Sequence, residues 1–392
     1  MVTAGHYRQS SEEISIAKQT LVIVGASARA AAASALRAGF APWCADLFAD
    51  ADLRRACPVR HIPADDYPEG LIGAVQDAPL GPWMYTGALE NRPDIVAKID
   101  RPLWGNPPEV LRRVRSPRLV HDCLARHGLP CPALATGVPD PGRRWLVKPV
   151  RSAAGRGIRW WQPGMRIDRR RVYLQEWIEG PAAAAIYVGQ AASTKLLGVT
   201  RQLVGEAWLG AAPFHYCGSV GPLALADATT ALLQQIGEAL AVEFDLRGLF
   251  GVDLVLRDGT PFVVEVNPRI TASLEVLERA TGQALLPLHA ATFGAVFGES
   301  PGLTPRSAAV AKGILFARQA LTFPEQGPWE HALRTPLADL TVPFADLPDP
   351  GARIEAGQPI CTVFADADRV ETCLTALHDA AGDLERFLYH RA

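Results

Sequence analysis

The stretch Leu246–Ser273 constrains the fold of this chain more than any other. Two runs rich in β-forming residues, Leu249–Leu256 and Pro261–Val266, flank an Arg-Asp-Gly turn at residues 257–259. An Asp-Gly pair between such runs is typical of a tight β-hairpin, because both residues tolerate a left-handed backbone. The sequence therefore predicts two antiparallel strands that fold back on each other here.

Three oxygen-bearing side chains interrupt the apolar residues of this hairpin. Asp253 lies mid-way along the first strand, and Glu265 and Asn267 lie on the second. Because side chains alternate between faces, Glu265 and Asn267 point the same way, and folding at Asp258–Gly259 brings Asp253 opposite them. Such a set of oxygen ligands suits Mg²⁺. The hairpin alone leaves a second interpretation open, a solvated sheet face on which Arg269 pairs with a glutamate.

Length and composition limit the class of protein. A chain of 392 residues is too long for one ordinary core, so two or three domains are expected. The formal net charge of −2 implies no general attraction to nucleic acid or to acidic lipid. No apolar run reaches the length of a membrane span. The first twenty residues are polar and lack the apolar segment of a signal peptide.

The cysteines predict a reducing compartment. The chain has seven, none of them in a CxxC pair, so neither structural zinc nor a disulfide framework is expected. We therefore expect a cytoplasmic protein.

The first third has the pattern of a βαβ unit. Leu21–Val24 predicts a buried strand, residues 25–29 a small-residue turn, Ala30–Ala38 a helix and Ala41–Asp46 a second, parallel strand. The turn lacks the GxGxxG pattern, so we do not expect a dinucleotide there. The segment Pro82–Glu90 predicts a strand whose end loop faces a cleft, and prolines near residues 106–117 mark a domain boundary.

The middle of the chain predicts a phosphate-binding flap. A helix is expected at residues 117–127, followed by the strand Trp145–Val150, which carries Lys148. The loop 151–157 is rich in small residues, so its backbone N–H groups can close over phosphates while Lys148 neutralises their charge. It is not a Walker loop. An ordinary hairpin with a surface lysine is the alternative.

The residues after the flap predict the remainder of a binding site. The strand Val172–Gly180 breaks at Glu179, and Trp177 and Ile178 could wall an adenine ring. Arg201, Gln202 and the Gly-rich loop 214–222 are expected to line the acceptor side. An amphipathic helix is expected at residues 224–244.

Taken in order, these pieces resemble the ATP-grasp superfamily of carboxylate–amine ligases. The resemblance covers residues 20–300 and rests on the turn 25–29, Lys148-Pro149, the loop 152–157, the hinge 175–180 and the run 251–269, which reads GVDLVL…FVVEVNPR. It implies a multidomain fold of the α/β and α+β classes. The implied parts are an N-terminal α/β pre-domain (1–110), a nucleotide-binding domain (111–305, small lobe about 130–185) and a small C-terminal β-rich domain (306–392).

The resemblance also implies the roles of individual residues. Mg²⁺ would be held by Asp253, Glu265 and Asn267. ATP would be bound by Lys148, Ser152, Gly155, Gly157, Glu176, Trp177, Ile178 and Glu179. The catalytic groups would be Arg269, Lys148 and Arg201. The implied reaction activates a carboxylate as an acyl phosphate and joins it to an amine. The implied partners are the small-molecule carboxylate and amine substrates, with no nucleic acid or membrane, and the resemblance is compatible with a homodimer.

Two departures from the family pattern bear on this expectation. Family members often carry a lysine before the first helix of the nucleotide domain, where this chain has Arg115-Ser116-Pro117-Arg118, so one of these arginines must serve. Many members also place an acidic residue just after the hinge, where Pro181–Ala185 is small and apolar. A non-catalytic nucleotide-binding protein is therefore the alternative. The runs 198–205 and 214–222 resemble a narrower group near tyramine–glutamate ligase, which implies one-carbon cofactor biosynthesis.

Overall fold

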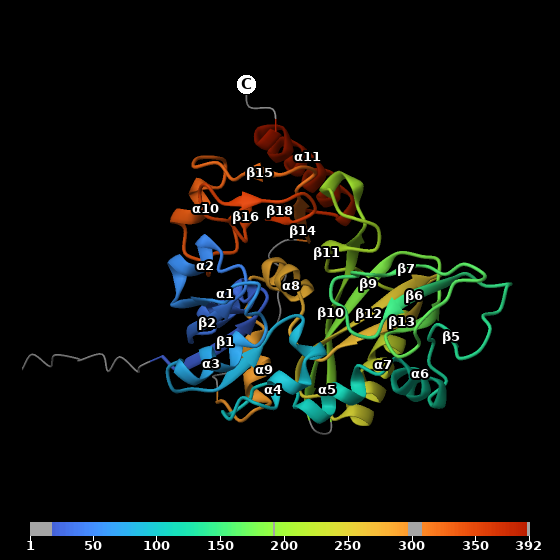
Figure 1. The fold of residues 1–392 in the computed structure, drawn as a ribbon. Coiled ribbons are helices and arrows are strands. Elements are labelled where there is room, and N and C mark those ends of the chain that lie inside the picture. Colours follow the sequence, from blue (N-terminus) through green and yellow to red (C-terminus); the bar gives the residue numbers. More distant parts are fainter. Residues whose placement is uncertain (1–17, 191–192, 297–307, 390–392) are drawn as a thin grey trace, which may run out of the picture.

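A computed structural model describes residues 18–190, 193–296 and 308–389 (Figure 1). Most of the polar N-terminal segment considered above, residues 1–17, lies outside the described residues. Within the described ranges, no helix combines the length and the apolar character needed to cross a membrane.

The N-terminal part is a parallel α/β layer, as its sequence predicts. Its four strands are ordered β3-β2-β1-β4, and Trp83 forms one further parallel bridge, to Leu103. β1 is central because Leu21, Val22, Ile23 and Val24 are fully buried on both faces. The elements are β1 (Thr20–Gly25), α1 (Arg29–Arg37), β2 (Ala41–Asp46), α2 (Ala51–Ala56), β3 (Val59–His61), α3 (Gly70–Asp77), β4 (Trp83–Tyr85), η1 (Leu89–Asn91), α4 (Pro93–Val96) and α5 (Pro108–Val114).

A small antiparallel lobe follows. Helix α6 (Pro117–Arg126) begins at Ser116, whose hydroxyl caps the backbone N–H of Leu119. The lobe's strands are ordered β5-β8-β6-β7, with bounds β5 (Leu134–Ala135), β6 (Trp145–Pro149), β7 (Arg159–Trp160) and β8 (Val172–Glu176). The strand expected at Val172–Gly180 is therefore shorter, because the chain leaves β8 at the hinge after Glu176.

One antiparallel sheet of eight strands forms the rest of the frame, in the order β13-β12-β9-β10-β11-β14-β18-β16. The sheet therefore continues past residue 306, where the sequence suggested a separate β-rich domain. Its strands are β9 (Ala182–Gln190), β10 (Ser193–Val204), β11 (Tyr216–Gly221), β12 (Gly248–Arg257), β13 (Thr260–Asn267), β14 (Ala309–Phe316), β16 (Phe344–Ala345) and β18 (Pro359–Ala367).

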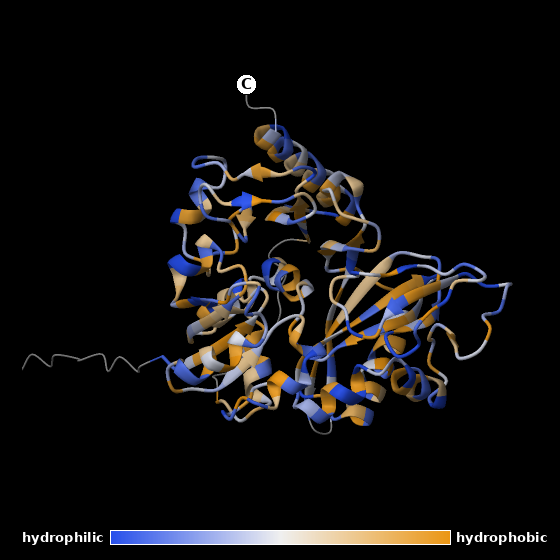
Figure 2. Ribbon diagram, in the orientation of Figure 1, coloured by the Kyte–Doolittle hydropathy of each residue, from blue (hydrophilic) through white to orange (hydrophobic). Residues whose placement is uncertain are grey.

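Helices cover both faces of this sheet. Apolar residues of α5, α6 and α7 pack with one face of β9, β12 and β13, whereas α8 and α9 pack between the other face and the N-terminal layer. Figure 2 shows the resulting apolar strands inside and polar helix faces outside. The remaining elements are η2 (Ala207–Leu209), α7 (Asp227–Phe244), α8 (Ser273–Thr281), α9 (Leu286–Ala291), β15 (Leu321–Thr322), α10 (Glu330–Arg334), β17 (Arg353–Ile354) and α11 (Val370–Tyr389).

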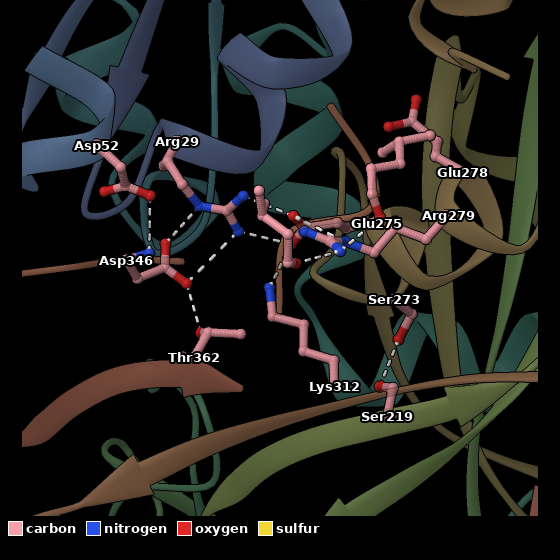
Figure 3. Close-up of polar contacts among 12 residues, drawn as sticks. Arg29, Asp52, Ser219, Ser273, Glu275, Glu278, Arg279, Lys312, Asp346 and Thr362 are labelled. Atoms are coloured by element: carbon pink, nitrogen blue, oxygen red, sulfur yellow. Dashed lines mark hydrogen bonds and ion pairs between the residues drawn. The ribbon is translucent and has the colours of Figure 1, made fainter. Parts of the chain in front are cut away.

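A buried charged network joins the three parts of the chain around α8 (Figure 3). Arg29 of α1 donates to both carboxylate oxygens of Glu275, at 2.5 and 2.6 Å, and its Nε donates to Asp346 at 2.8 Å. Lys312 of β14 donates to Glu275 at 2.7 Å. Burial alone would raise the pKa of Glu275, but the charges of Arg29 and Lys312 hold that pKa well below its usual range. The network fixes α8, which follows the hairpin after the short segment 268–272.

Candidate active site

The hairpin brings Asp253 and Glu265 into direct opposition on β12 and β13. Gly251 is the partner of Asn267 in the same register, so Asn267 projects from the same face as the two carboxylates. The turn is left-handed at Asp258 (φ 51°) and at Gly259 (φ 77°), as a two-residue turn of this kind requires. The three oxygen-bearing side chains therefore lie together on one face.

Neutral donors hold the first carboxylate. Asp253 accepts a hydrogen bond from the Asn267 amide at 2.9 Å and another from the Gln202 amide of β10, also at 2.9 Å. Burial and the adjacent charge of Glu265 raise the pKa of Asp253 to about 6, although the two amides and the charge of Arg269 act to lower it. Asp253 therefore lacks a full counter-charge.

Cations surround the second carboxylate. Arg115 donates to Glu265 and, at 3.1 Å, to the carbonyl of Val266. Burial would raise the pKa of Glu265, yet the charges of Arg115 and Lys148 hold it below its usual value. Of the two arginines expected to replace the family's lysine, Arg115 is therefore the one that contacts the hairpin.

This donor set fits a magnesium ion. Within the described ranges, no three His, Cys, Asp or Glu side chains lie close enough together to bind a metal ion by themselves. The hairpin instead supplies two carboxylates and one amide oxygen, and Mg²⁺ uses few protein ligands and fills its shell with water and phosphate oxygens. The two opposed carboxylates, one of them short of a counter-charge, would be stabilised by such an ion.

Lys148 faces the hairpin from the small lobe. It is 7% exposed and donates to the Gln175 amide oxygen at 3.0 Å and to the carbonyl of Val264 at 3.3 Å. Gln175 lies on the same face of the small sheet because its partner in β6, Leu146, is two residues from Lys148. Gln175 was expected only as part of the hinge 175–180, although its alternation with Tyr173 on β8 was a signal that could have placed it beside Lys148.

The small-residue loop lies closed over this region. The carbonyl of Ser152 accepts a hydrogen bond from the Asn91 side chain at 2.9 Å, and the carbonyl of Ala154 accepts one from the backbone N–H of Tyr216 at 3.2 Å. At Gly155 (φ 77°) a Cβ atom would lie 1.9 Å from the carbonyl oxygen of Phe214, so only glycine allows this approach. Ser152 and Gly155 both line the cavity that contains Lys148, whereas Gly157 does not.

The hinge residues are engaged elsewhere. Glu176 accepts hydrogen bonds from the backbone N–H of Ala133 at 3.1 Å and from Arg143 at 2.9 Å. The Trp177 ring packs edge-on against Trp160, with 5.1 Å between centroids. Ile178 is buried and Glu179 is exposed, and none of residues 176–179 lines the cavity beside Lys148. Their roles around adenine stay predictions.

The N-terminal part contributes Glu90. Arg269 donates to Glu90 at 2.7 Å, to the carbonyl of Ile270 at 2.9 Å and to the Asn267 amide oxygen at 3.4 Å. Burial would raise the pKa of Glu90, but the charge of Arg269 keeps it below its usual value. The strand-end loop singled out in the sequence therefore meets the end of the hairpin.

Arg201 is not brought to the site. Arg201 and Gln202 are neighbours on β10, so their side chains leave opposite faces of the sheet. Gln202 contacts Asp253, whereas Arg201 is exposed on the other face. The sequence did not determine which of these two neighbours faces the hairpin, and in the structure it is Gln202.

Residues 118–273 match the family model described as "ATP-grasp domain". An uncharacterized protein of Methanocaldococcus jannaschii is 23% identical over 217 residues, which are 55% of this chain and 47% of that protein. The carbamoyl phosphate synthase large chain of Beutenbergia cavernae is 24% identical over 212 residues, 47% of this chain and 19% of that protein. The chain thus spans half or less of the length of these relatives.

Two solved structures extend the likeness over nearly the whole chain. The L-amino acid ligase of Bacillus licheniformis has a TM-score of 0.66 at 16% identity, covering 93% of this chain and 97% of that one. The biotin carboxylase domain of the Hydrogenobacter thermophilus 2-oxoglutarate carboxylase, solved with MgADP, ADP and bicarbonate, has a TM-score of 0.68 at 13% identity, covering 92% and 89%. At these identities the likeness establishes the fold.

Proposed function

Since residues 118–273 form an ATP-grasp domain, we propose that the chain is an ATP-dependent ligase that joins a carboxylate to an amine. One observation carries the proposal: Asp253 and Glu265 oppose each other on one hairpin face, with Lys148 and a closed small-residue loop beside them. Oxygen ligands, a buried cation and the backbone N–H groups of a small-residue loop form a site suited to a nucleotide triphosphate. Solved structures of the same fold include an amino acid ligase.

Each residue has a defined task in the proposed reaction. Asp253, Glu265 and Asn267 would hold Mg²⁺, which offsets the charge on the phosphates. Lys148 would neutralise the phosphate that leaves with ADP, and the loop 152–157 would shield the transfer from water. Arg269 would offset the charge of the substrate carboxylate.

The bond changes follow the chemistry of acyl phosphates. A carboxylate oxygen of the acid attacks the terminal phosphorus of ATP, and the bond to ADP breaks. The amine nitrogen then attacks the acyl carbon, inorganic phosphate leaves, and an amide remains. The finer proposal, that acid and amine belong to methanofuran or tetrahydromethanopterin-type cofactor biosynthesis, rests on the resemblance of the runs 198–205 and 214–222.

The test measures acid-dependent ADP release. The full chain is incubated with ATP, Mg²⁺ and a panel of carboxylic acids, with hydroxylamine present to trap an acyl phosphate as a hydroxamate. We expect ADP and hydroxamate in equal amounts with at least one acid, and amide formation when a matching amine replaces hydroxylamine.

A non-catalytic nucleotide-binding protein is the second candidate, because the stretch after the hinge offers no group for a ribose. Ala183, Ala184 and Ala185 are buried in β9, and Glu179 is exposed. ATP binding in calorimetry, together with no ADP release for any acid, would favour this candidate over a ligase.

A further inference from the structure

We propose that a groove beside the hairpin binds the anionic remainder of the acid substrate, which would carry at least two negative charges besides the reacting carboxylate. The inference deepens the proposed function and rests on it for the reacting end of the ligand only. The groove has a volume of about 660 Å³, within the range of small-molecule sites. It lies between the α5–α6 corner and the small lobe and shares Arg115 and Tyr173 with the cavity beside Lys148.

The lining of this groove, which we call the arginine groove, is strongly basic. Counting its histidine as basic, the groove is lined by two acidic side chains, Glu90 and Asp122, and six basic ones: Arg112, Arg115, Arg118, His121, Arg151 and Arg169. Glu90 is already neutralised by Arg269. Because the whole chain has a formal net charge of −2, this positive charge is a local feature of the groove. Concave walls concentrate such a field on a bound anion.

Two of the arginines are held in place. Both terminal nitrogens of Arg169 donate to backbone carbonyls of the small lobe, those of Ala135 and Gly137, each at 2.6 Å. Arg115 is fixed by Glu265 and by the Asn91 amide oxygen at 3.1 Å. A guanidinium held in this way loses little conformational entropy when it binds a carboxylate or phosphate.

The other arginines have charge to spare. In the described part of the chain, no side-chain hydrogen bond or ion pair engages Arg112 or Arg151, and both are exposed. Arg118 has one weak ion pair, to Asp122 at 3.7 Å, in which both side chains are largely exposed. The N-terminus of α6 at Ser116 adds its dipole to the same groove. A ligand with several carboxylate or phosphate groups would meet this surplus of donors.

The inner end of the groove lies beside the proposed transfer site. Arg115 lines the groove and donates to Glu265, and Glu90 lines it and accepts from Arg269. An acid that extends along the groove can therefore place one carboxylate near Arg269 while its remaining charges lie among Arg112, Arg118 and Arg151. The triphosphate of ATP is a second source of the same anionic chemistry, and the experiment separates the two.

The experiment is a calorimetric titration of the full chain with three probes: 1,2,3-propanetricarboxylate, butyrate, and ATP with Mg²⁺. The variant R112Q/R151Q is compared with the wild type, with R112K/R151K as a charge-conserving rescue. R353Q is the matched control, because Arg353 is 69% exposed and pairs with Glu355 in the C-terminal part. Circular dichroism melts check that each variant is folded.

We expect the tricarboxylate to bind the wild type more than about tenfold tighter than butyrate, because several charge-assisted hydrogen bonds form at once. R112Q/R151Q should lose about tenfold or more of that affinity, while R112K/R151K and R353Q keep most of it. Raising the salt concentration should weaken the tricarboxylate selectively.

Two results would overturn the inference. Equal affinities for tricarboxylate and butyrate would show that the groove does not select multiply charged acids. An equal loss of ATP and tricarboxylate affinity in R112Q/R151Q would assign the groove to the nucleotide's own triphosphate. The titration needs no turnover, so tricarboxylate binding without any acid-dependent ADP release would refute the ligase and leave the groove in place.

Discussion

Arg269, at the end of the hairpin, donates a hydrogen bond to Glu90 of the N-terminal part across 2.7 Å. The two side chains are 14% and 1% exposed. Neither the Nε of Arg269 nor the second carboxylate oxygen of Glu90 has a hydrogen-bond partner among the described residues. A buried donor and a buried acceptor left unpaired are costly, so a bound polar ligand could stabilise both. The N-terminal part thus contributes a side chain, Glu90, to the candidate site.

The opposed carboxylates give the first prediction. D253N or E265Q should lower ADP formation about 100-fold or more, because the proposed Mg²⁺ loses a charged ligand while the two strands of the hairpin remain paired. D258N makes the same chemical change at the exposed turn, where asparagine also tolerates the left-handed backbone (φ 51°), and should retain activity. Steady-state ADP release measures all three. Wild-type rates in E265Q would contradict the metal assignment.

The closed loop gives the second. G155A places a Cβ atom 1.9 Å from the Phe214 carbonyl, so the loop must move away and the KM for ATP should rise by about tenfold. G164A is matched for backbone conformation, since Gly164 has φ 82° and no atom lies within 4 Å of its added Cβ. It should leave the KM unchanged. A similar KM in the two variants would show that the contact with Phe214 is unimportant.

The two faces of β10 give the third. Q202A removes the amide that donates to Asp253 at 2.9 Å and should reduce kcat by about tenfold. R201A alters an exposed side chain on the opposite face and should have little effect. Initial rates at saturating ATP compare them, and a larger loss in R201A would return the catalytic role to the arginine.

The charged network around α8 gives the fourth. E275Q leaves Arg29 and Lys312 without their shared carboxylate, and breaking a buried ion pair in this way costs about 3–5 kcal/mol of unfolding free energy. E355Q removes one partner of an exposed pair with Arg353 and should cost less than about 1 kcal/mol. Urea unfolding followed by fluorescence distinguishes them. Equal losses would mean that the network contributes no more than a surface pair.

The fifth prediction concerns pH. Burial raises the pKa of Asp52 to about 6, above its usual 3.8, and its oxygens accept backbone hydrogen bonds from Asp346 at 3.0 Å and Leu347 at 3.1 Å. A raised pKa contributes stability below pH 3.8 that is lost as the pH rises through about 6. Between about pH 5 and 7.5 the wild type should therefore lose about 1 kcal/mol that D52N does not lose. Urea unfolding of both proteins at the two pH values measures this loss. If the difference in unfolding free energy between the wild type and D52N is the same at both pH values, the raised pKa of Asp52 is contradicted.

Local patterns predicted what is local in the fold. The hairpin was predicted correctly because an Asp-Gly turn and strict alternation determine its register, and which side chains share a face, within about twenty residues of sequence. The βαβ unit was also predicted correctly, because its buried strand, turn and helix follow one another in the sequence, although α1 begins at Arg29 rather than Ala30. Helix and strand boundaries elsewhere shifted by a few residues because caps and hinges set them.

Long-range contacts could not be predicted from such patterns. Gln202 reaches Asp253 only because β9 pairs with both β10 and β12, which fixes the phase of β10 relative to the hairpin. The pair of Glu90 and Arg269 joins positions 179 residues apart. The pairing of β11 with β14 likewise joins distant segments, and no local pattern in residues 306–392 predicts it.

That pairing limits how the protein can be recombined. The strand that carries Glu265 and the last strands of the chain belong to one sheet, and Lys312 of β14 holds the helix that follows the hairpin. Chimeras that exchange the final third with a relative would pair β11 with a foreign β14 and remove the partner of Glu275. Crossovers at the hinge near Gly180, where the small lobe ends, would leave the sheet intact.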